Sequence, residues 1–481
     1  MIPGLAICAL TRKEALTLMA TATAPLHTAK LSRRVHRPFA ERSPRFLLLL
    51  VVGVALLIRM VVVSFLFRGV ADPAHHHSEF GEEVGWIARS LATHQGFSSP
   101  FFPSTGSTAI IPPLYPFLLS AIFRVFGLYS VASAFVILSL NSLFSALTCI
   151  PIYFATRSTL GPRAALYAGW AWAFYPFAVY FSAGRVWEYS LTSLLLTTCF
   201  CLALRLHRND RPATWLGFGL LFGITVLSNP AVLSLFIVFT LIALWKLNRK
   251  GGRYLRAGLL AALGMVAVLT PWTIRNYRAL HVICPVRDSL GYEFWSGNNG
   301  DTSNPTLEWS HPASNPEELQ LYTSQGEIAY IAQKNVLGKE WVRHHKADFT
   351  RLTIRRFIYY WTGFWSLDPV YTKAEPFQFP NTFFCSSLTI LLLLGARRLW
   401  NTNREAALCY MVPIVLFPLA YYVTHPLMDY RQPIEPEIIV VVVMGVSALR
   451  AWWRSRATAY VTPAAQSAVS VISVPEIASL T

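Results

Sequence analysis

Three glutamates stand close together in the first polar stretch of the chain, at Glu79, Glu82 and Glu83. Carboxylates crowded beside hydrocarbon repel one another and lose solvent, and both effects raise a carboxyl pKa toward neutral. A carboxylate tuned in this way can take a proton from a hydroxyl group. Glu79 and Glu83 are one helical turn apart, so a continuous helix would place them on one face. The cluster predicts a general base, with a solvated acidic helix face as the alternative.

Six further charged residues lie within reach of the same outer surface, most of them a few residues from the end of an apolar stretch. They are Arg185, Glu188, Arg275, Glu293, Asp429 and Arg431. We assign all six to substrate binding. An arginine fork suits phosphate oxygens, so Arg431, Arg275 and Arg185 are the candidates for gripping a phosphate. An ion pair that pins the loop 425–436 is the alternative for Arg431. Glu188 can orient a substrate, or it can cap the helix that follows it.

Three consecutive histidines, His75-His76-His77, precede the glutamates. They cannot all bind one metal ion on a regular helix, but an irregular loop can present two of them. His75 and His77 are therefore weak candidates for a metal site. The sequence has no Walker loop, no helix-opening GxGxxG and no DxD pair, so nucleotide chemistry has no support. We expect no required cofactor, and a divalent metal remains an open alternative.

The composition is that of a membrane protein. Of 481 residues, 54% are hydrophobic and only 14% are charged, and the mean hydropathy is +0.43. The formal charge is +17, and much of the excess lies beside apolar stretches. Cytoplasmic loops of membrane proteins are rich in Lys and Arg, which also meet lipid headgroups, and this explains the charge better than nucleic-acid binding does. We therefore expect no nucleic-acid partner. The seven cysteines show neither a disulfide framework nor a zinc spacing.

Ten apolar stretches are candidates for membrane spans. They are 46–67, 131–155, 164–182, 189–206, 214–228, 230–247, 257–274, 382–399, 406–423 and 438–453. Suppose that an additional helix at 110–127 lies at the outer surface and does not cross the membrane. The Lys- and Arg-rich segments between the spans then all fall on the inner side. This arrangement places both termini in the cytoplasm and the glutamates outside it. We expect an all-α polytopic membrane protein of about ten transmembrane helices, with interfacial juxtamembrane helices and a small extracytoplasmic α-helical segment.

The chain divides accordingly into a basic disordered cytoplasmic tail (1–45), an N-terminal transmembrane module (46–275), an extracytoplasmic segment (276–356), a C-terminal transmembrane module (357–455) and a second disordered cytoplasmic tail (456–481). The first module contains the first outer loop, 68–108, and the juxtamembrane helix 110–127. In the extracytoplasmic segment, Asn315 followed by Pro316, Glu317 and Glu318 predicts a helix start and a helix to about residue 345. The aromatic and basic stretch 353–365 is typical of a helix at headgroup level.

Several motifs together indicate a family. They are Ile87-Ala88-Arg89 after the acids, Gly96-Phe97-Ser98-Ser99-Pro100, Pro112-Pro113-Leu114-Tyr115-Pro116, Pro271-Trp272-Thr273-Ile274-Arg275-Asn276-Tyr277, Gly291-Tyr292-Glu293-Phe294-Trp295 and Tyr430-Arg431-Gln432-Pro433-Ile434-Glu435-Pro436. In this order, over about 45–455, the chain resembles the C-type glycosyltransferase superfamily. Within it, the chain is similar to bacterial relatives of the protein O-mannosyltransferases and of the lipid A aminoarabinose transferase.

The resemblance implies transfer of a sugar from a polyprenyl-phosphate donor to an extracytoplasmic acceptor of unknown type, in the bacterial inner membrane. The expected partners are the polyprenyl-phosphate-linked sugar, the lipid bilayer and that acceptor. In members of the family, an acidic residue in the first outer loop, commonly Asp, is the catalytic base. This chain offers Glu83, then Glu79, then Glu82. Direct displacement at the anomeric carbon would invert its configuration.

Two other classes of function remain as alternatives. A lipid-linked-sugar flippase or transporter would need charged groups along a path through the membrane, and no Asp or Glu lies in the middle of a predicted span. A non-catalytic membrane scaffold would bind a partner through 276–356 and would tolerate neutral replacements of Glu79 and Glu83.

Overall fold

The computed structural model describes residues 43–72, 74, 76–208, 211–300, 310–367, 369–374 and 376–469. Most of the first predicted tail, residues 470–481 of the second and His75, one of the weak metal candidates, lie outside the described residues. Residues 456–469, predicted to be disordered, are helical. From Arg45 onward the chain forms one compact unit. In the described ranges the regular structure is helical, and the sole sheet-like pairing is an isolated bridge between Ser98 and Ser107. The predicted all-α polytopic class is confirmed, and the chain is a multi-pass membrane protein.

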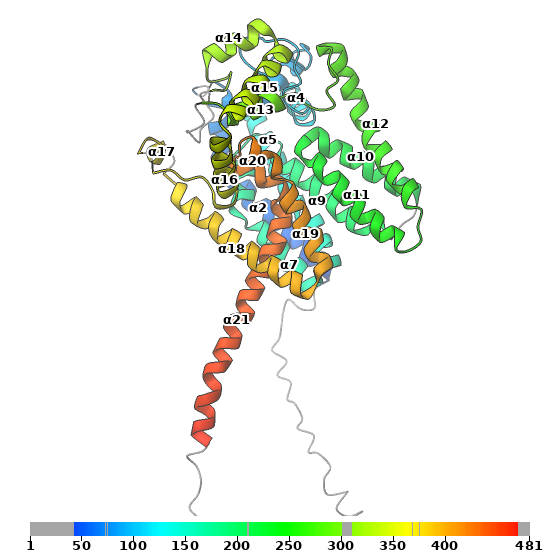
Figure 1. The fold of residues 1–481 in the computed structure, drawn as a ribbon, viewed down its shortest axis with the longest axis vertical. Helices are drawn as coiled ribbons and strands as arrows, with labels where there is room; N and C mark the ends of the chain where they lie inside the picture. Colours follow the sequence, from blue (N-terminus) through cyan, green and yellow to red (C-terminus); the bar gives the residue numbers. More distant parts are fainter. Residues whose placement is uncertain are drawn as a thin grey trace, which may run out of the picture. The chain divides into compact units, whose positions relative to one another are not determined.

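Seven helical stretches in the described ranges are long and apolar enough to cross a membrane (Figure 1). They are α2 (Pro44–Val70), α5 with α6 (Val131–Leu147 and Cys149–Leu160), α9 (Tyr189–Leu206), η3 with α11 (Pro230–Val232 and Leu233–Asn248), α12 (Tyr254–Leu280), α18 (Gln378–Thr402), and α19 with α20 (Arg404–Leu416 and Leu419–Val423). Each coincides with one of the predicted spans.

The three remaining predicted spans fold differently from the simple helices expected. The stretch 164–182 forms two helices, α7 (Pro162–Ala173) and α8 (Pro176–Ala183). The break follows from Pro176, which lacks an N–H and pushes the preceding residue out of the helical region. The stretch 214–228 forms α10 (Pro212–Ser228), only 17 residues long, and 438–453 lies in the N-terminal half of α21 (Glu435–Val469).

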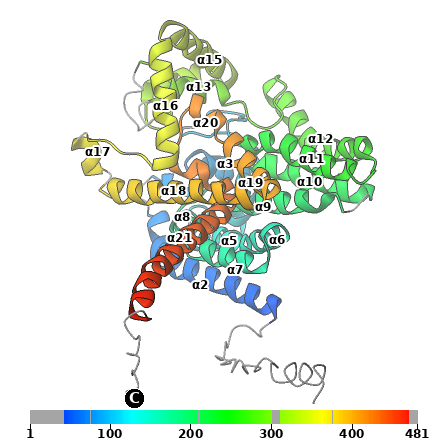
Figure 2. The same ribbon diagram turned by 60° about the horizontal axis from the view of Figure 1, so that its bottom comes forward.

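Glycines bring two pairs of membrane helices into close contact. A methyl group added at Gly219 of α10 would meet the carbonyl oxygen of Ala261 of α12, and Gly264 of α12 is equally confined from the other side. Gly395 of α18 and Gly445 of α21 form a second contact of this kind. Both views show α10 beside α12 (Figure 2). Small residues permit such backbone approach, which is a main source of packing energy between membrane helices.

The other described helices belong mainly to the segments predicted to lie outside. They are α3 (Glu83–Ala92), α4 (Leu114–Phe126), α13 (Leu290–Gly297), α14 (Pro316–Gln325), α15 (Glu327–His344), α16 (Lys346–Thr362) and α17 (Pro369–Ala374). Asn315 caps α14 as predicted, since its side chain accepts hydrogen bonds from the backbone N–H groups of Glu317 and Glu318. The helix predicted to run unbroken to residue 345 is interrupted at Gly326, where φ is +80°.

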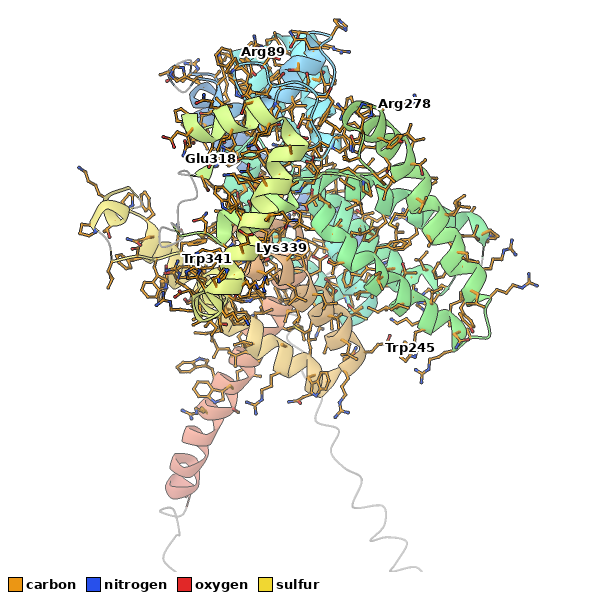
Figure 3. The ribbon with its side chains drawn as sticks, turned by 45° about the horizontal axis from the view of Figure 1, so that its top comes forward. Arg89, Trp245, Arg278, Glu318, Lys339 and Trp341 are labelled. Carbon is orange, nitrogen blue, oxygen red and sulfur yellow. The ribbon has the colours of Figure 1, made fainter. Side chains whose placement is uncertain are left out.

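The bundle has two distinguishable ends. In Figure 3, Arg89 of α3 and Arg278 at the end of α12 lie toward one end, and Trp245 of α11 lies toward the other. Arg278 ends a span that the charge pattern predicts to run outward. The end that carries α3 is therefore the predicted outer end.

The contact between α10 and α12 can be tested with a single methyl group. We expect Gly219→Ala to destabilise the protein by about 1–3 kcal/mol, because the added group overlaps the Ala261 backbone. Thermal unfolding of the purified protein in detergent measures the effect.

Gly217→Ala is the matched control, because Gly217 lies on the same helix and faces open space. Alanine is the better helix former, so this variant should be at least as stable as the wild type. Equal unfolding temperatures for both variants would contradict the close approach.

Candidate functional site

The backbone of the first outer loop turns sharply between two of the predicted acids. Gly81 and Glu82 have φ values of +90° and +42°, so the short helix η2 (Ser78–Phe80) ends and α3 begins anew at Glu83. The prediction that Glu79 and Glu83 share one helical face is therefore wrong. A side chain at Gly81 would collide with the carbonyl oxygen of Val186. Strained backbone at a non-glycine residue such as Glu82 is typical of functional sites.

Glu83 forms an ion pair with a histidine from a distant part of the chain. Its Oε1 lies 2.7 Å from Nε2 of His311, and the two side chains are 9% and 23% exposed. The rings of Phe101 and Tyr292 stand edge-on to the His311 ring, at centroid distances of 5.6 and 6.0 Å. Aromatic side chains from the first outer loop and from α13 therefore shield the pair from solvent.

The pair carries both charges at neutral pH. Burial alone raises the pKa of Glu83, but His311 and Arg287 outweigh it, and the pKa lies below its ordinary value. Burial lowers the pKa of His311, but the Glu83 carboxylate outweighs it and raises the pKa to about 9. The prediction that crowding raises the pKa of Glu83 is therefore wrong, because a cationic partner dominates the neighbouring acids.

Glu82, Glu83 and His311 together form a group that could hold a metal ion. One ligand atom from each lies within 4.8 Å of the others. Two carboxylate oxygens and one imidazole nitrogen suit zinc or manganese, and a bound metal would require His311 to give up its proton. Of the two predicted metal candidates, His77 instead stacks on Tyr129 with ring centroids 4.4 Å apart, and His75 is not described.

Arg287 forms the centre of a second polar cluster. Its guanidinium lies 3.2 Å from Glu293, whose other oxygen is 3.4 Å from Nε2 of His425. The same His425 nitrogen is 3.1 Å from the hydroxyl of Tyr430. The charge of Arg287 also acts on Glu83 and on Glu188. Arg287 is therefore the cation that connects the first outer loop with the segments around residues 188, 293 and 425–430.

Glu188 is buried at the start of α9 and keeps its proton at neutral pH. Burial raises the pKa of this carboxyl to about 8, although Arg287 and a hydrogen bond from Asn229 lower it. Nδ2 of Asn229 lies 3.2 Å from Oε1. The side chain makes no capping hydrogen bond to α9, so the capping alternative for Glu188 is not observed. A neutral carboxyl in this position can donate a hydrogen bond to a ligand oxygen.

Asp429 and Arg185 belong to the same polar region. The hydroxyl of Tyr189 donates a hydrogen bond to Asp429. Burial lowers the pKa of Arg185, but Tyr180, Glu79 and Asp429 outweigh it and raise the pKa. The structure thus brings together Glu79, Arg185 and Asp429, three of the predicted residues, from three separate loops.

Two predicted phosphate-binding arginines are engaged elsewhere. Arg431 is buried, pairs with Glu435 and donates to the carbonyl oxygen of Tyr360 at 3.1 Å. Arg275 donates to the carbonyl oxygen of Thr108 at 2.6 Å and stacks on Phe97. The ion-pair alternative for Arg431 is observed, and Arg275 holds the end of the first outer loop. A phosphate contact for either residue stays a prediction.

Sequence reasoning left His311 and Arg287 without a role. His311 is an isolated histidine before a proline in a long polar segment, and no spacing links it to Glu83. Arg287 has a weak signal, because it follows an apolar span on the predicted outer side. Only the folded chain places either residue beside the glutamates.

Comparison with known proteins gives one family match. Residues 111–272 match the family model described as dolichyl-phosphate-mannose-protein mannosyltransferase. The matched residues include α4 to α11 and most of α12, and they contain Glu188 but not Glu83 or His311. A comparison with curated protein sequences gave no match.

Two solved structures resemble the chain at low sequence identity. The Archaeoglobus fulgidus oligosaccharyltransferase in its apo form is 13% identical, with a TM-score of 0.49 over 88% of this chain and 52% of that one. ArnT from Cupriavidus metallidurans bound to undecaprenyl phosphate is 13% identical, with a TM-score of 0.36 over 83% of this chain and 77% of that one. The chain spans about half the length of the archaeal enzyme.

The family match falls within the stretch over which the sequence motifs predict a C-type glycosyltransferase. It includes the Pro112–Pro116 motif and the beginning of the Pro271–Tyr277 motif. Over residues 111–272 the predicted resemblance to the dolichyl-phosphate-mannose-protein mannosyltransferases is confirmed.

Proposed function

We propose that the chain is an integral-membrane glycosyltransferase of the bacterial inner membrane. It moves a sugar from a polyprenyl-phosphate donor to an acceptor outside the cytoplasm. The buried Glu83–His311 pair beside Arg287 carries this proposal, because it joins an ionised carboxylate and a cation at the predicted outer end of the bundle. The family-model match supports glycosyltransferase activity. The Lys- and Arg-rich segments that the charge pattern assigns to the cytoplasmic side support a position of the site on the other side of the membrane.

Glu83 is the proposed base. Its lowered pKa keeps the carboxylate anionic and able to accept the proton of an acceptor hydroxyl or amine, although it makes Glu83 a weaker base than a carboxylate with a raised pKa would be. The acceptor atom then forms a bond to the anomeric carbon of the sugar while the bond from that carbon to the phosphate oxygen breaks. The phosphate leaves with the electron pair. Attack from the face opposite the phosphate inverts the configuration at the anomeric carbon.

Arg287 is the proposed partner of the departing phosphate. A charge-assisted hydrogen bond from a guanidinium stabilises phosphate charge as it develops. Arg287 acts electrostatically on Glu83 and Glu188, and in-line displacement would require the anomeric carbon to lie between the acceptor held by Glu83 and the phosphate held by Arg287. Arg185, beside Asp429 and Glu79, is the second candidate. Protonated Glu188 would donate a hydrogen bond to a sugar or acceptor oxygen.

A divalent cation would fit beside the base. Glu82, Glu83 and His311 supply two carboxylates and an imidazole within 4.8 Å of one another. Such an ion would supply positive charge close to the phosphate. The steps assigned to Glu83, Arg287 and Glu188 do not require it.

The role of Glu83 predicts a selective loss of turnover. We expect Glu83→Gln to lower kcat roughly 10²- to 10⁴-fold, the usual contribution of a general base. Binding of the donor should change little, because the amide keeps the shape of the side chain. Transfer from a purified polyprenyl-phosphate sugar, together with donor binding and thermal unfolding, measures these effects.

Glu340→Gln is the matched control, because Glu340 is exposed on α15 away from the cluster. It should retain the activity of the wild type. Full turnover by Glu83→Gln would eliminate Glu83 as the base, and full turnover by the corresponding variants of Glu79 and Glu82 as well would favour the scaffold alternative.

The protonation of Glu188 predicts an alkaline limit of activity. Its folded pKa of about 8 means that the hydrogen-bond donor is present below pH 8 and lost as the pH rises through 8. We expect kcat/KM of the wild type to fall over this range. Glutamine donates at every pH, so Glu188→Gln should remain active and should not show the fall near pH 8.

The pH profile of Glu340→Gln provides the control and should follow that of the wild type. A decline near pH 8 that persists unchanged in Glu188→Gln would assign the titration to another group. Loss of all activity in Glu188→Gln would show that the carboxyl, and not merely its hydrogen-bond donor, is required.

A further inference from the structure

A cavity of about 240 Å³ lies between the ends of four membrane helices, α6, α9, α11 and α19. These ends are the ones that the charge pattern assigns to the cytoplasm, so the cavity is at the opposite end of the bundle from Glu83. Its polar lining comes from Thr159, His207, Arg208, Lys246, Asn403 and Glu405. The volume is smaller than that of a typical pocket for a drug-sized ligand, which is about 300–1,000 Å³. It suits a compact polar group.

The lining carries an excess of positive charge. Lys246 pairs with Glu405 at 2.6 Å, and the pair leaves no net charge. Arg208 is exposed at the end of α9, and its guanidinium has no ion pair within the described ranges. Arg249 and Lys250 follow α11 directly. An anion in the cavity would therefore meet the charge of Arg208, and Lys250, which does not line the cavity, also acts electrostatically on His207 of the lining.

His207 offers an unused hydrogen-bonding atom at the same place. Its Nδ1 is buried and has no hydrogen-bond partner in the part of the chain that the structure describes. Burial together with Lys246, Lys250 and Arg208 lowers the pKa of His207, so the ring is neutral at neutral pH. A neutral imidazole donates from one nitrogen. A buried polar atom without a partner is unfavourable unless a ligand or water satisfies it.

Three arginine–tryptophan contacts mark the height of this cavity in the membrane. They are Arg249 over Trp245 at 4.6 Å, Arg404 over Trp400 at 5.8 Å and Arg456 over Trp452 at 4.2 Å. Tryptophan collects at the boundary between hydrocarbon and headgroups. Trp245 and Arg404 are the direct neighbours of Lys246 and Glu405 in the sequence, and Figure 3 shows Trp245 at this end of α11. The cavity thus lies at the level of the lipid phosphates.

We propose that this cavity binds the phosphate group of an anionic lipid of the inner leaflet. Arg208 supplies the uncompensated positive charge, Lys246 shares its charge between the phosphate and Glu405, and Nδ1 of His207 donates a hydrogen bond, while the acyl chains remain in the bilayer. Free phosphate has the same chemistry and is the other source of such a group. The site stands apart from the proposed transfer reaction, because it shares no residue with the Glu83 and Arg287 clusters.

Lipid retention by the full-length protein tests the site. Purified protein in detergent is mixed with phosphatidylglycerol or with phosphatidylcholine, and bound lipid is counted by native mass spectrometry. We expect the wild type to retain phosphatidylglycerol preferentially. Arg208→Gln should weaken this retention roughly fivefold, the effect of one cation near a charged membrane surface. The double variant Lys246→Gln with Glu405→Gln should weaken it too, although it leaves the net charge unchanged.

Arg397→Gln is the matched control, because Arg397 is an exposed arginine on α18 that does not line the cavity. It should retain phosphatidylglycerol like the wild type, and the unfolding temperatures should show that all variants are folded. Equal retention by every variant, or equal retention of both lipids by the wild type, would overturn the proposal. A separate arm adds inorganic phosphate alone. If only this anion stabilises the wild type, and not Arg208→Gln, the assignment to a lipid is wrong.

Discussion

A guanidinium buried among the membrane helices holds the helix ends that position the first outer loop of the candidate site. Arg59 of α2 is fully buried and donates to the carbonyl oxygens of Ala173 and Trp172 at 3.1 and 3.3 Å. These carbonyls belong to the last turn of α7, where a helix leaves acceptors without intrahelical partners. A charge at this depth is costly unless it is satisfied in this way, so Arg59 and the break after α7 stabilise each other. The chain then continues through α8 to the loop at 184–188, where the carbonyl of Val186 fits against Gly81. The position of the first outer loop therefore depends on a charge inside the membrane.

Two carboxyl groups near one arginine have opposite protonation states in this structure. Glu83 faces the imidazolium of His311 and stays ionised, whereas at Glu188 burial outweighs Arg287 and the hydrogen bond from Asn229, so this carboxyl keeps its proton at neutral pH. Pairs of acids whose surroundings drive their pKa values apart are a general way to obtain a base and a hydrogen-bond donor in one place. The division of roles follows from the partners of each group, since both are shielded from solvent.

The sequence predicted the features that local signals determine. The apolar stretches became helices, and Asn315 caps α14 because capping needs only neighbouring residues. Pro176 itself indicates the helix break before it. The stretch was nevertheless predicted as one span, because the residues on both sides of the proline are apolar. The candidate site was only partly predictable. Glu83 was favoured among the three acids because of its place before Ile87-Ala88-Arg89. Its partner His311 and the central Arg287 come from other segments, and they reach Glu83 through tertiary contacts that no spacing in the chain reveals.

The arginine–tryptophan stacks at the ends of α11 and α18 and in the middle of α21 also set how the protein responds to its surroundings. They hold that end of the bundle at a fixed depth, because each tryptophan favours the interface and each arginine favours the lipid phosphates. Any mismatch between the protein and the thickness of the bilayer must then be absorbed at the other end. Longer or shorter acyl chains would thus raise or lower the hydrocarbon boundary beneath Glu83, and with it the height at which a membrane-embedded substrate meets the carboxylate.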